Sequence, residues 1–195
     1  DRDYVDFLQF HKFWNPPKKT PIEETINCLM NLKKKGRVRV IGVSNVSLEE
    51  LVSYRLAGKL GSSQSRYSTL LRVAEHEQTP FCKNIRSPEL PTGAWSRTCL
   101  QAVLARAAFL GRMVLEITLQ IGCHVFGIEN RRPLKGMVST WKDLAEKYSS
   151  SIGNISMAWT LGQPGVTPVL IVNRSSHQAV SNPYSGFLRL DDEDM

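Results

Sequence analysis

Hydrophobic residues follow two different periods along the first sixty positions. The stretch 3–11 is rich in apolar and aromatic residues, and 38–43 holds branched apolar residues, so each predicts a strand. Between them, apolar residues recur at helical spacing. These are Ile22, Ile26, Leu29 and Leu32. The order strand, helix, strand, helix predicts an α/β fold with a parallel sheet.

Polar residues and glycine mark where these elements begin and end. Ser47–Glu50 has the capping-box form, with a hydroxyl followed three residues later by a carboxylate. Thr20–Glu23 has the same form, with proline at the first helical position. Gly36 follows a run of lysines and is expected to end the first helix. A weaker strand is predicted near 61–65.

The predicted strands end in residues that can bind a ligand. His11 closes the first strand, and Ser44 and Asn45 follow the second strand directly, just before a capped helix. In β/α barrels the active site lies at the C-terminal ends of the strands. We therefore expect these side chains to face a ligand.

The C-terminal part repeats the pattern of a strand that leads into a helix. Val169–Val172 is apolar, and Ser175–Gln178 has the spacing of a capped helix start. A helix N-terminus attracts anions, and Arg174 just before it suits a phosphate, because its guanidinium can bond two oxygens. Pro183 is expected to kink or end this helix.

Taken together, these segments resemble the aldo-keto reductase family. The resemblance covers roughly residues 1–83 and 125–190. It rests on 4–11, 20–25, 36–45, 64–68, 144–148, 157–159, 163–166 and 174–178. It implies one α/β domain over 1–195, incomplete at its N-terminus: a partial (β/α)8 TIM barrel, from about the fourth strand to the eighth. Such barrels typically need about 250 residues.

The middle of the chain departs from the family pattern. Residues 84–124 show no family match, and no lysine occurs from Asn84 to Leu134. Read one nucleotide earlier, the codons for Thr92–Arg97 can encode a family-like segment. One hypothesis is therefore that this stretch is read out of frame, with the frame restored near Val125. Ordinary divergence and an insertion are the alternatives, and the coding DNA would decide among them.

The resemblance also implies a chemistry. Family members reduce carbonyls with a nicotinamide cofactor and a tetrad of aspartate, tyrosine, lysine and histidine. Only the histidine maps onto this chain, as His11, where it would orient the substrate carbonyl. Tyr4 and Tyr67 fall at other family positions and are no substitutes for the tetrad tyrosine. Trp14 is equally consistent with a substrate-pocket wall and with simple packing.

Cofactor contacts are the best represented part of the family pattern. Ser44, Asn45 and Gln64 match the contacts to the nicotinamide carboxamide, whose two polar ends suit amide and hydroxyl groups. Arg174, at the helix start with Ser175, matches the residue that reads the 2′-phosphate, so NADP(H) is the expected cofactor. Gln178 and Asn182 match contacts around the adenine. One departure is Val172–Asn173, where the family usually has Gly-Ala.

Composition changes this picture little. The 195 residues carry a formal net charge of +7, but the basic residues lie at helix ends and caps, so no nucleic-acid partner is expected. The four cysteines show no paired spacing, so neither a metal site nor a disulfide framework is indicated. No apolar run reaches membrane-spanning length and no signal peptide opens the chain, which predicts a cytoplasmic protein.

Two functions remain open at this level. The first is an NADP(H)-dependent reductase of aldehydes or ketones, of which this chain is the C-terminal portion and by itself inactive. The second is a non-catalytic form: a truncated product, or a cofactor-binding subunit similar to potassium-channel β subunits. The second would bring a partner, either another copy of the chain or a channel-type protein. The sequence does not name the carbonyl substrate.

Overall fold

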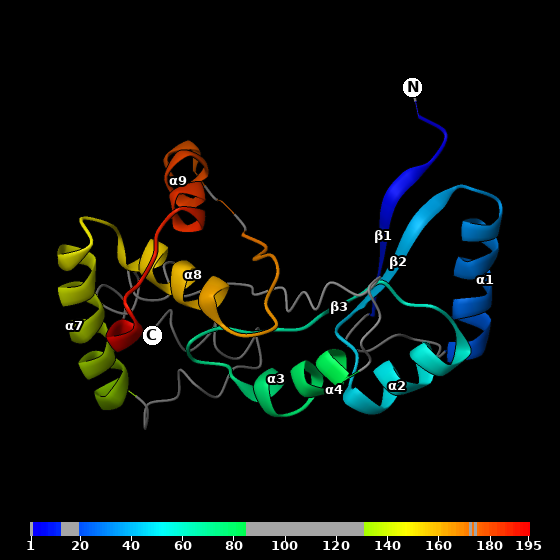
Figure 1. The fold of residues 1–195 in the computed structure, drawn as a ribbon, viewed down its shortest axis with the longest axis horizontal. Coiled ribbons are helices and arrows are strands. Elements are labelled where there is room, and N and C mark those ends of the chain that lie inside the picture. Colours follow the sequence, from blue (N-terminus) through cyan, green and yellow to red (C-terminus); the bar gives the residue numbers. More distant parts are fainter. Residues whose placement is uncertain (1, 13–19, 85–130, 172, 174) are drawn as a thin grey trace. The chain divides into compact units, whose positions relative to one another are not determined.

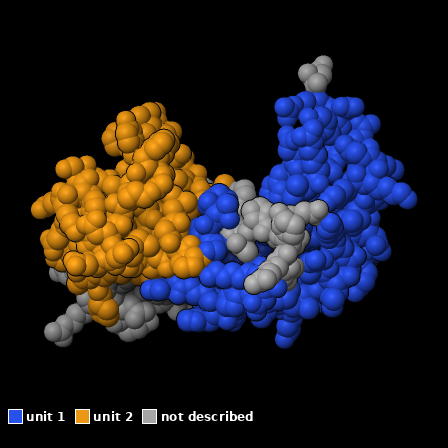
Figure 2. All heavy atoms as spheres, in the orientation of Figure 1, with its two compact units in different colours: residues 1–67, 72–96, 165–168 blue, residues 68–71, 97–164, 169–195 orange. Residues whose placement is uncertain are grey.

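The computed structural model describes residues 2–12, 20–84, 131–171, 173 and 175–195 (Figure 1). The chain divides into two compact units, shown in different colours in Figure 2. Unit 1 comprises 1–67, 72–96 and 165–168, and unit 2 comprises 68–71, 97–164 and 169–195. Each unit is described by itself below.

A three-stranded parallel sheet forms the centre of unit 1 (Figure 1). Its strands are β1 (Val5–His11), β2 (Val38–Ser44) and β3 (Ser62–Gln64), in the order β1-β2-β3. All pairings are parallel, as the alternation of strands and helices predicted. The strands predicted within 3–11 and at 38–43 and the weaker strand near 61–65 are thus confirmed.

Two helices cover one face of this sheet. α1 (Ile22–Lys34) runs alongside β2, and α2 (Leu48–Ala57) follows it along the chain (Figure 1). The core between sheet and helices consists of branched, aliphatic and aromatic side chains. It comprises Ile26, Leu29, Val38, Ile41, Val43, Val46, Leu51, Tyr54 and Leu60. The helical periodicity therefore identified the buried face of α1 correctly, since Ile22 and Leu32 also pack against this core.

The helix ends agree with the sequence in two cases of three. Ser47 caps α2 through a complete capping box with Glu50. Gly36 follows the end of α1 with φ of 72°, a conformation that glycine adopts without strain. The box predicted at Thr20 is absent, because α1 begins one residue later than expected. Pro21 is therefore the N-cap, without a side-chain cap bond, and Thr25 N–H donates to the Pro21 carbonyl.

Two short helices complete the described part of unit 1. They are α3 (Val73–His76) and α4 (Gln78–Asn84). Phe81 and Cys82 of α4 pack against the core of the sheet and helices. Burial raises the pKa of the Cys82 thiol to about 11.

The described part of unit 2 is mainly helical, with one isolated antiparallel bridge between Ser68 and Leu71. It contains α7 (Arg131–Lys147), α8 (Ile152–Gly162) and α9 (Ser176–Ser181), followed by the 3₁₀ turns η3 (Asn182–Gly186) and η4 (Asp192–Asp194). Residues 153–160 of α8 are all buried, so this helix is the centre of the unit. The C-terminus is tied to it, because Trp159 Nε1 donates to the Met195 carbonyl at 2.6 Å.

The strand predicted at Val169–Val172 is not formed at 169–171, and Val172 lies outside the described residues. A strand needs a neighbour to satisfy its backbone, and none of the three described strands pairs with this segment. Pro183 behaves as predicted: α9 ends at Ser181, and proline lies at the start of η3. The 84–124 segment lies outside the described residues apart from Asn84.

Candidate functional site at the strand ends

The register of the sheet brings three predicted site residues into one row. His11, the last residue of β1, lies opposite Ser44 at the end of β2, and Ser44 lies opposite Gln64 at the end of β3. Paired residues in neighbouring strands share a face of the sheet. The three side chains therefore belong to one face at its carboxyl edge, where parallel α/β folds bind ligands.

Asn45 connects the first two strand ends. Its side-chain Nδ2 lies 2.8 Å from His11 Nε2, so the amide and the imidazole are hydrogen-bonded. The backbone of Asn45 has φ of 59°, a left-handed conformation that asparagine tolerates better than most residues. Asn45 N–H donates to the Gln64 carbonyl at 3.2 Å, which ties the turn to β3 as well. Asn45 thus contacts both neighbours of Ser44 in the row.

Ser44 is the most buried member of the row. It is 1% exposed, and its Oγ has no hydrogen-bond partner among the described residues. A buried hydroxyl without a partner is unfavourable by about 1–3 kcal/mol, and such groups are rare in folded proteins. A ligand that presents a polar group at the strand ends would relieve this deficit.

An ion pair braces the segments on either side of the row. Lys12, which follows His11, pairs through Nζ with Glu50 of α2. Glu50 also accepts from the Ser47 N–H at 2.9 Å. Burial by itself would raise the pKa of Glu50, but the hydrogen bonds from Lys12 and Ser47 outweigh it and lower the pKa. The carboxylate is therefore charged and holds the end of β1 to the start of α2.

Gln78 of α4 ties together the loops that follow β2 and β3. Its Nε2 donates to the Val46 carbonyl at 2.9 Å, and its Oε1 accepts from the Ser65 hydroxyl. Both partners lie one residue beyond a predicted site residue. Sequence reasoning missed Lys12, Glu50 and Gln78 as parts of the site, because their partners lie 13 to 38 residues away along the chain.

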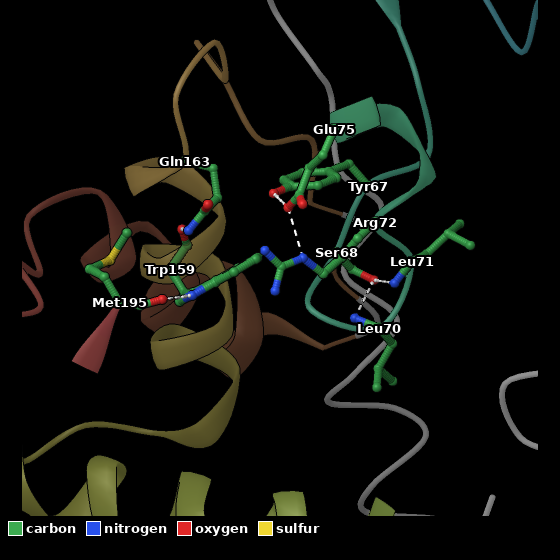
Figure 3. A network of polar contacts seen from close by, with 9 residues as sticks. All are labelled: Tyr67, Ser68, Leu70, Leu71, Arg72, Glu75, Trp159, Gln163 and Met195. Atoms are coloured by element: carbon green, nitrogen blue, oxygen red, sulfur yellow. Dashed lines mark hydrogen bonds and ion pairs between the residues drawn. The ribbon is translucent and has the colours of Figure 1, made fainter. Parts of the chain in front are cut away.

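Neither Tyr4 nor Tyr67 is available as a proton donor beside His11. Tyr4 precedes β1 and so lies at the opposite end of that strand, about 23 Å from His11 at roughly 3.3 Å per residue. Its hydroxyl accepts from Arg39 at 3.0 Å. Tyr67 is buried and donates its hydroxyl to Glu75, as Figure 3 shows.

The environment of Tyr67 keeps its phenol protonated. Burial raises the pKa of Tyr67, and its hydrogen bond to Glu75 raises it further. Arg72 Nε donates to the same carboxylate at 2.8 Å. Burial would raise the pKa of Glu75, but the bonds from Arg72 and Tyr67 lower it overall. That Tyr67 is no substitute for the family tyrosine stays a prediction from its position in the sequence.

The predicted adenine-side residues lie in unit 2. Ser175 caps α9, and its Oγ accepts from the Gln178 N–H at 3.3 Å. Asn182 is buried rather than presented to solvent, and its Nδ2 donates to Asn173 Oδ1 at 2.5 Å. Arg174 and Trp14 lie outside the described residues. The assignment of this group to a phosphate or adenine site remains a prediction.

Comparison with known proteins decides the family. The model of the "Aldo/keto reductase family" matches residues 1–195. The chain belongs to the aldo-keto reductase family. The resemblance of the sequence motifs is thereby confirmed, and the family is one of oxidoreductases. The match spans the 84–124 stretch, but it does not test the explanations offered for that stretch.

Three relatives show how much of a family member this chain represents. It is 28% identical to the NADH-specific methylglyoxal reductase of Escherichia coli, over 98% of the chain and 57% of that protein. It is 30% identical to the aldo-keto reductase YhdN of Bacillus subtilis, over 84% and 47%. A solved glycerol dehydrogenase of Gluconobacter oxydans matches with a TM-score of 0.75 at 24% identity, over 98% and 56%.

Two facts follow for the aldo-keto reductase chain. It spans about half the length of the curated relatives it matches. Its fold, an α/β arrangement with a three-stranded parallel sheet, matches part of the barrel of these enzymes. In the part of the chain that the structure describes, no helix has the length and apolar character needed to cross a bilayer.

Proposed function

We propose that this chain is part of an NAD(P)H-dependent aldo-keto reductase that reduces an aldehyde or ketone to the alcohol. The observation that carries the proposal is the row of His11, Ser44 and Gln64, linked by Asn45 at the carboxyl edge of the sheet. Family membership supplies the reaction class, and the row supplies polar groups where that class binds its reactants.

The strand ends fit the carboxamide of a nicotinamide. This group has one carbonyl acceptor and one NH₂ donor, so it needs both a donor and an acceptor from the protein. The Ser44 hydroxyl can serve as either and has no described partner, while Asn45 and Gln64 are amides. When bound, the cofactor supplies the hydride. These three side chains would hold the ring at the edge of the sheet.

His11 is the proposed substrate-binding member of the row. Its imidazole would donate a hydrogen bond to the substrate carbonyl and so fix and polarise it. The hydrogen bond to Asn45 restrains the ring. The next residue, Lys12, is held at two points: its N–H donates to the Ser44 carbonyl at 3.1 Å, and its Nζ pairs with Glu50. The tetrad aspartate, tyrosine and lysine have no counterparts at matching positions of this chain. We place β1, β2 and β3 as the fourth to sixth strands of the barrel.

NADP(H) is the proposed cofactor, because Arg174 matches the residue that reads the 2′-phosphate. The relative from Escherichia coli is NADH-specific, so family membership alone does not decide between NADPH and NADH for this chain. An arginine at that position supports NADP(H), since its guanidinium pairs with phosphate through two oxygens.

The test is cofactor binding by the chain and two serine variants. Dissociation constants for NADPH and NADH are measured by quenching of protein fluorescence. Ser44→Ala is expected to lower the affinity for both cofactors, because each carries the carboxamide. Ser63→Ala is the control, since Ser63 is also a buried serine without a described partner but lies on the other face of the sheet. Equal effects of the two variants would contradict the proposed role of the row.

The alternative function is a non-catalytic cofactor-binding subunit, with a second copy or a channel-type protein as partner. A turnover assay separates the two. The 195-residue polypeptide by itself is expected to bind NADPH without reducing aldehydes, because the loss of a general acid lowers rates by about 10²–10⁴-fold. Turnover at an ordinary enzyme rate would show that the chain supplies its own proton donor. A longer protein with the tetrad residues that still fails to turn over would favour the subunit.

A further inference from the structure

A second row of paired residues lies next to the row of His11, Ser44 and Gln64, toward the amino ends of the strands. Gln9 of β1 is opposite Gly42 of β2, and Gly42 is opposite Ser62 of β3. Each of these residues is two positions before a member of the row of His11, Ser44 and Gln64. Because side chains alternate between faces with a period of two, both rows lie on the same face of the sheet.

The Gln9 side chain spans β2 to reach β3. Its Nε2 donates to the Val43 carbonyl, and its Oε1 accepts from the Ser62 hydroxyl at 3.1 Å. One amide therefore connects all three strands. Both polar ends of the part-buried amide are satisfied, which is the condition under which a buried polar group specifies a structure rather than destabilises it.

Glycine at position 42 is what makes this bridge fit. A Cβ there would lie 2.1 Å from Ser62 Oγ, 2.4 Å from Gln9 Oε1 and 2.9 Å from Phe7 Cζ. These distances are shorter than any real van der Waals contact. The amide thus passes over the backbone of β2 through the space that a side chain would fill.

The bridge matters most for β3, which has only three residues and hence few ladder bonds. Short strands specify their register weakly, and a slip by one residue turns every side chain to the other face. A side-chain bond at Ser62 opposes such a slip. Gln64, two residues on, then stays on the same face as Ser44.

We propose that Gln9 is a positioning residue of the cofactor site, which acts through Ser62 to hold Gln64 beside Ser44. The inference rests on the proposed function, in which these two residues bind the nicotinamide carboxamide. It adds that the geometry of that site depends on the neighbouring row of Gln9, Gly42 and Ser62. Gln9 itself makes no contact with the cofactor.

The experiment compares Ser62→Ala with Ser63→Ala in the full chain. Both serines are buried in β3, but only Ser62 bonds to Gln9. Dissociation constants are measured for NADPH and for adenosine 2′,5′-bisphosphate, which lacks the nicotinamide. Ser62→Ala is expected to lower the affinity for NADPH about two- to tenfold, which is the effect of one hydrogen bond. The affinity for the bisphosphate should stay the same. Ser63→Ala should change neither.

A double-mutant cycle tests that Gln9 acts through Ser62. Gln9→Met keeps the length of the side chain without its polar atoms. If Gln9 acts through its bond to Ser62, the double variant raises the dissociation constant for NADPH by less than the product of the two single-variant factors. Multiplicative effects, or equal losses for NADPH and the bisphosphate, would overturn the proposal.

Failure of the proposed function gives a different result. In that case the unmodified chain binds neither compound, and the positioning role is read from backbone amide NMR signals. Ser62→Ala should shift the signals of Ser44, Asn45 and Gln64 more than Ser63→Ala does. Equal shifts would overturn the positioning role whether or not the chain binds a cofactor.

Discussion

The strand ends of unit 1 and residues 174–182 of unit 2 carry the two groups of predicted cofactor residues. In unit 1, the register of three parallel strands alone brings His11, Ser44 and Gln64 together. In unit 2, residues 169–171 form no strand, and the described hydrogen bonds of Ser175 are local: its Oγ accepts from the Gln178 N–H and its carbonyl accepts from the Ala179 N–H. A ladder of strands fixes the positions of its end residues, whereas a segment without a paired neighbour leaves them dependent on individual side-chain contacts.

The largest expected effect is on stability, and it distinguishes Gly42 of unit 1 from Gly136 of unit 2. Gly42→Ala places a Cβ among Gln9, Ser62 and Phe7, so we expect a loss of about 2–4 kcal/mol in the free energy of unfolding from overpacking and the broken bridge. Gly136→Ala in α7 meets no described atom within 4 Å and should stabilise its helix by about 0.5–1 kcal/mol. Urea unfolding followed by circular dichroism measures both. A neutral Gly42→Ala would mean that the three-strand bridge is not formed.

Arg174→Ala tests whether unit 2 holds a phosphate site. The affinity for NADPH should fall about ten- to a hundredfold, which is the effect of a charge-assisted hydrogen bond. The affinity for NADH should change little, because NADH lacks the 2′-phosphate. Titration of both cofactors at low and high salt measures this, and salt should erode the preference. Equal losses for the two cofactors would make Arg174 a structural residue and remove the assignment of NADP(H).

Two tyrosines that donate to carboxylates offer a third contrast. Tyr67 is 2% exposed and bonds Glu75, so Tyr67→Phe should lower the free energy of unfolding by about 1 kcal/mol. Tyr148 donates to Asp194 and accepts from the Asp191 N–H near the exposed C-terminus, so Tyr148→Phe should have a smaller effect. Thermal melts of both variants measure the difference. A larger loss at Tyr148 would show that the C-terminal network contributes more than its exposure suggests.

The smallest effect concerns acid stability and the brace between Lys12 and Glu50. The pKa of Glu50 is lowered from 4.5 on folding, so its contribution is complete above about pH 4.5 and is lost as the pH falls through the folded value. Glu50→Gln should therefore remove about 0.3–1 kcal/mol of stability at pH 7 and flatten the acid dependence below pH 4.5. Glu49→Gln, on the same turn of α2, is the matched control, because it removes a carboxylate that forms no ion pair among the described residues. Melting temperatures between pH 3 and 7 decide.

The three strands of unit 1 and its helices α1 and α2 could be predicted from sequence, because their signals are local, whereas α3 and α4 were not predicted. The periodicity at Ile26 and Leu29, the capping box at Ser47 and the polar ends of two apolar runs each lie within a few residues. The start of α1 shows the limit of such signals, since Thr20 matches the capping pattern and yet Pro21, not Thr20, is the N-cap.

What could not be predicted from the sequence depends on contacts between distant segments. Nothing near Gln9 indicates that its amide reaches Ser62, 53 residues later, over a glycine between them. The same holds for Lys12 and its partner on α2. In unit 2 the apolar run at Val169 resembles a strand, but a strand forms only where a neighbour supplies hydrogen bonds, and a single segment does not encode that neighbour.

Cys82 provides unit 1 with a built-in reporter of local opening. Its thiol is half-buried with a pKa near 11, whereas Cys28 on α1 is exposed. Alkylating reagents attack the thiolate, so Cys28 should react at once and Cys82 only when α4 leaves the core. With Cys99 and Cys123 replaced by serine, the delay between the two reactions times that departure. The labelling rate of one side chain would then report how often α4 leaves the core of unit 1 under native conditions.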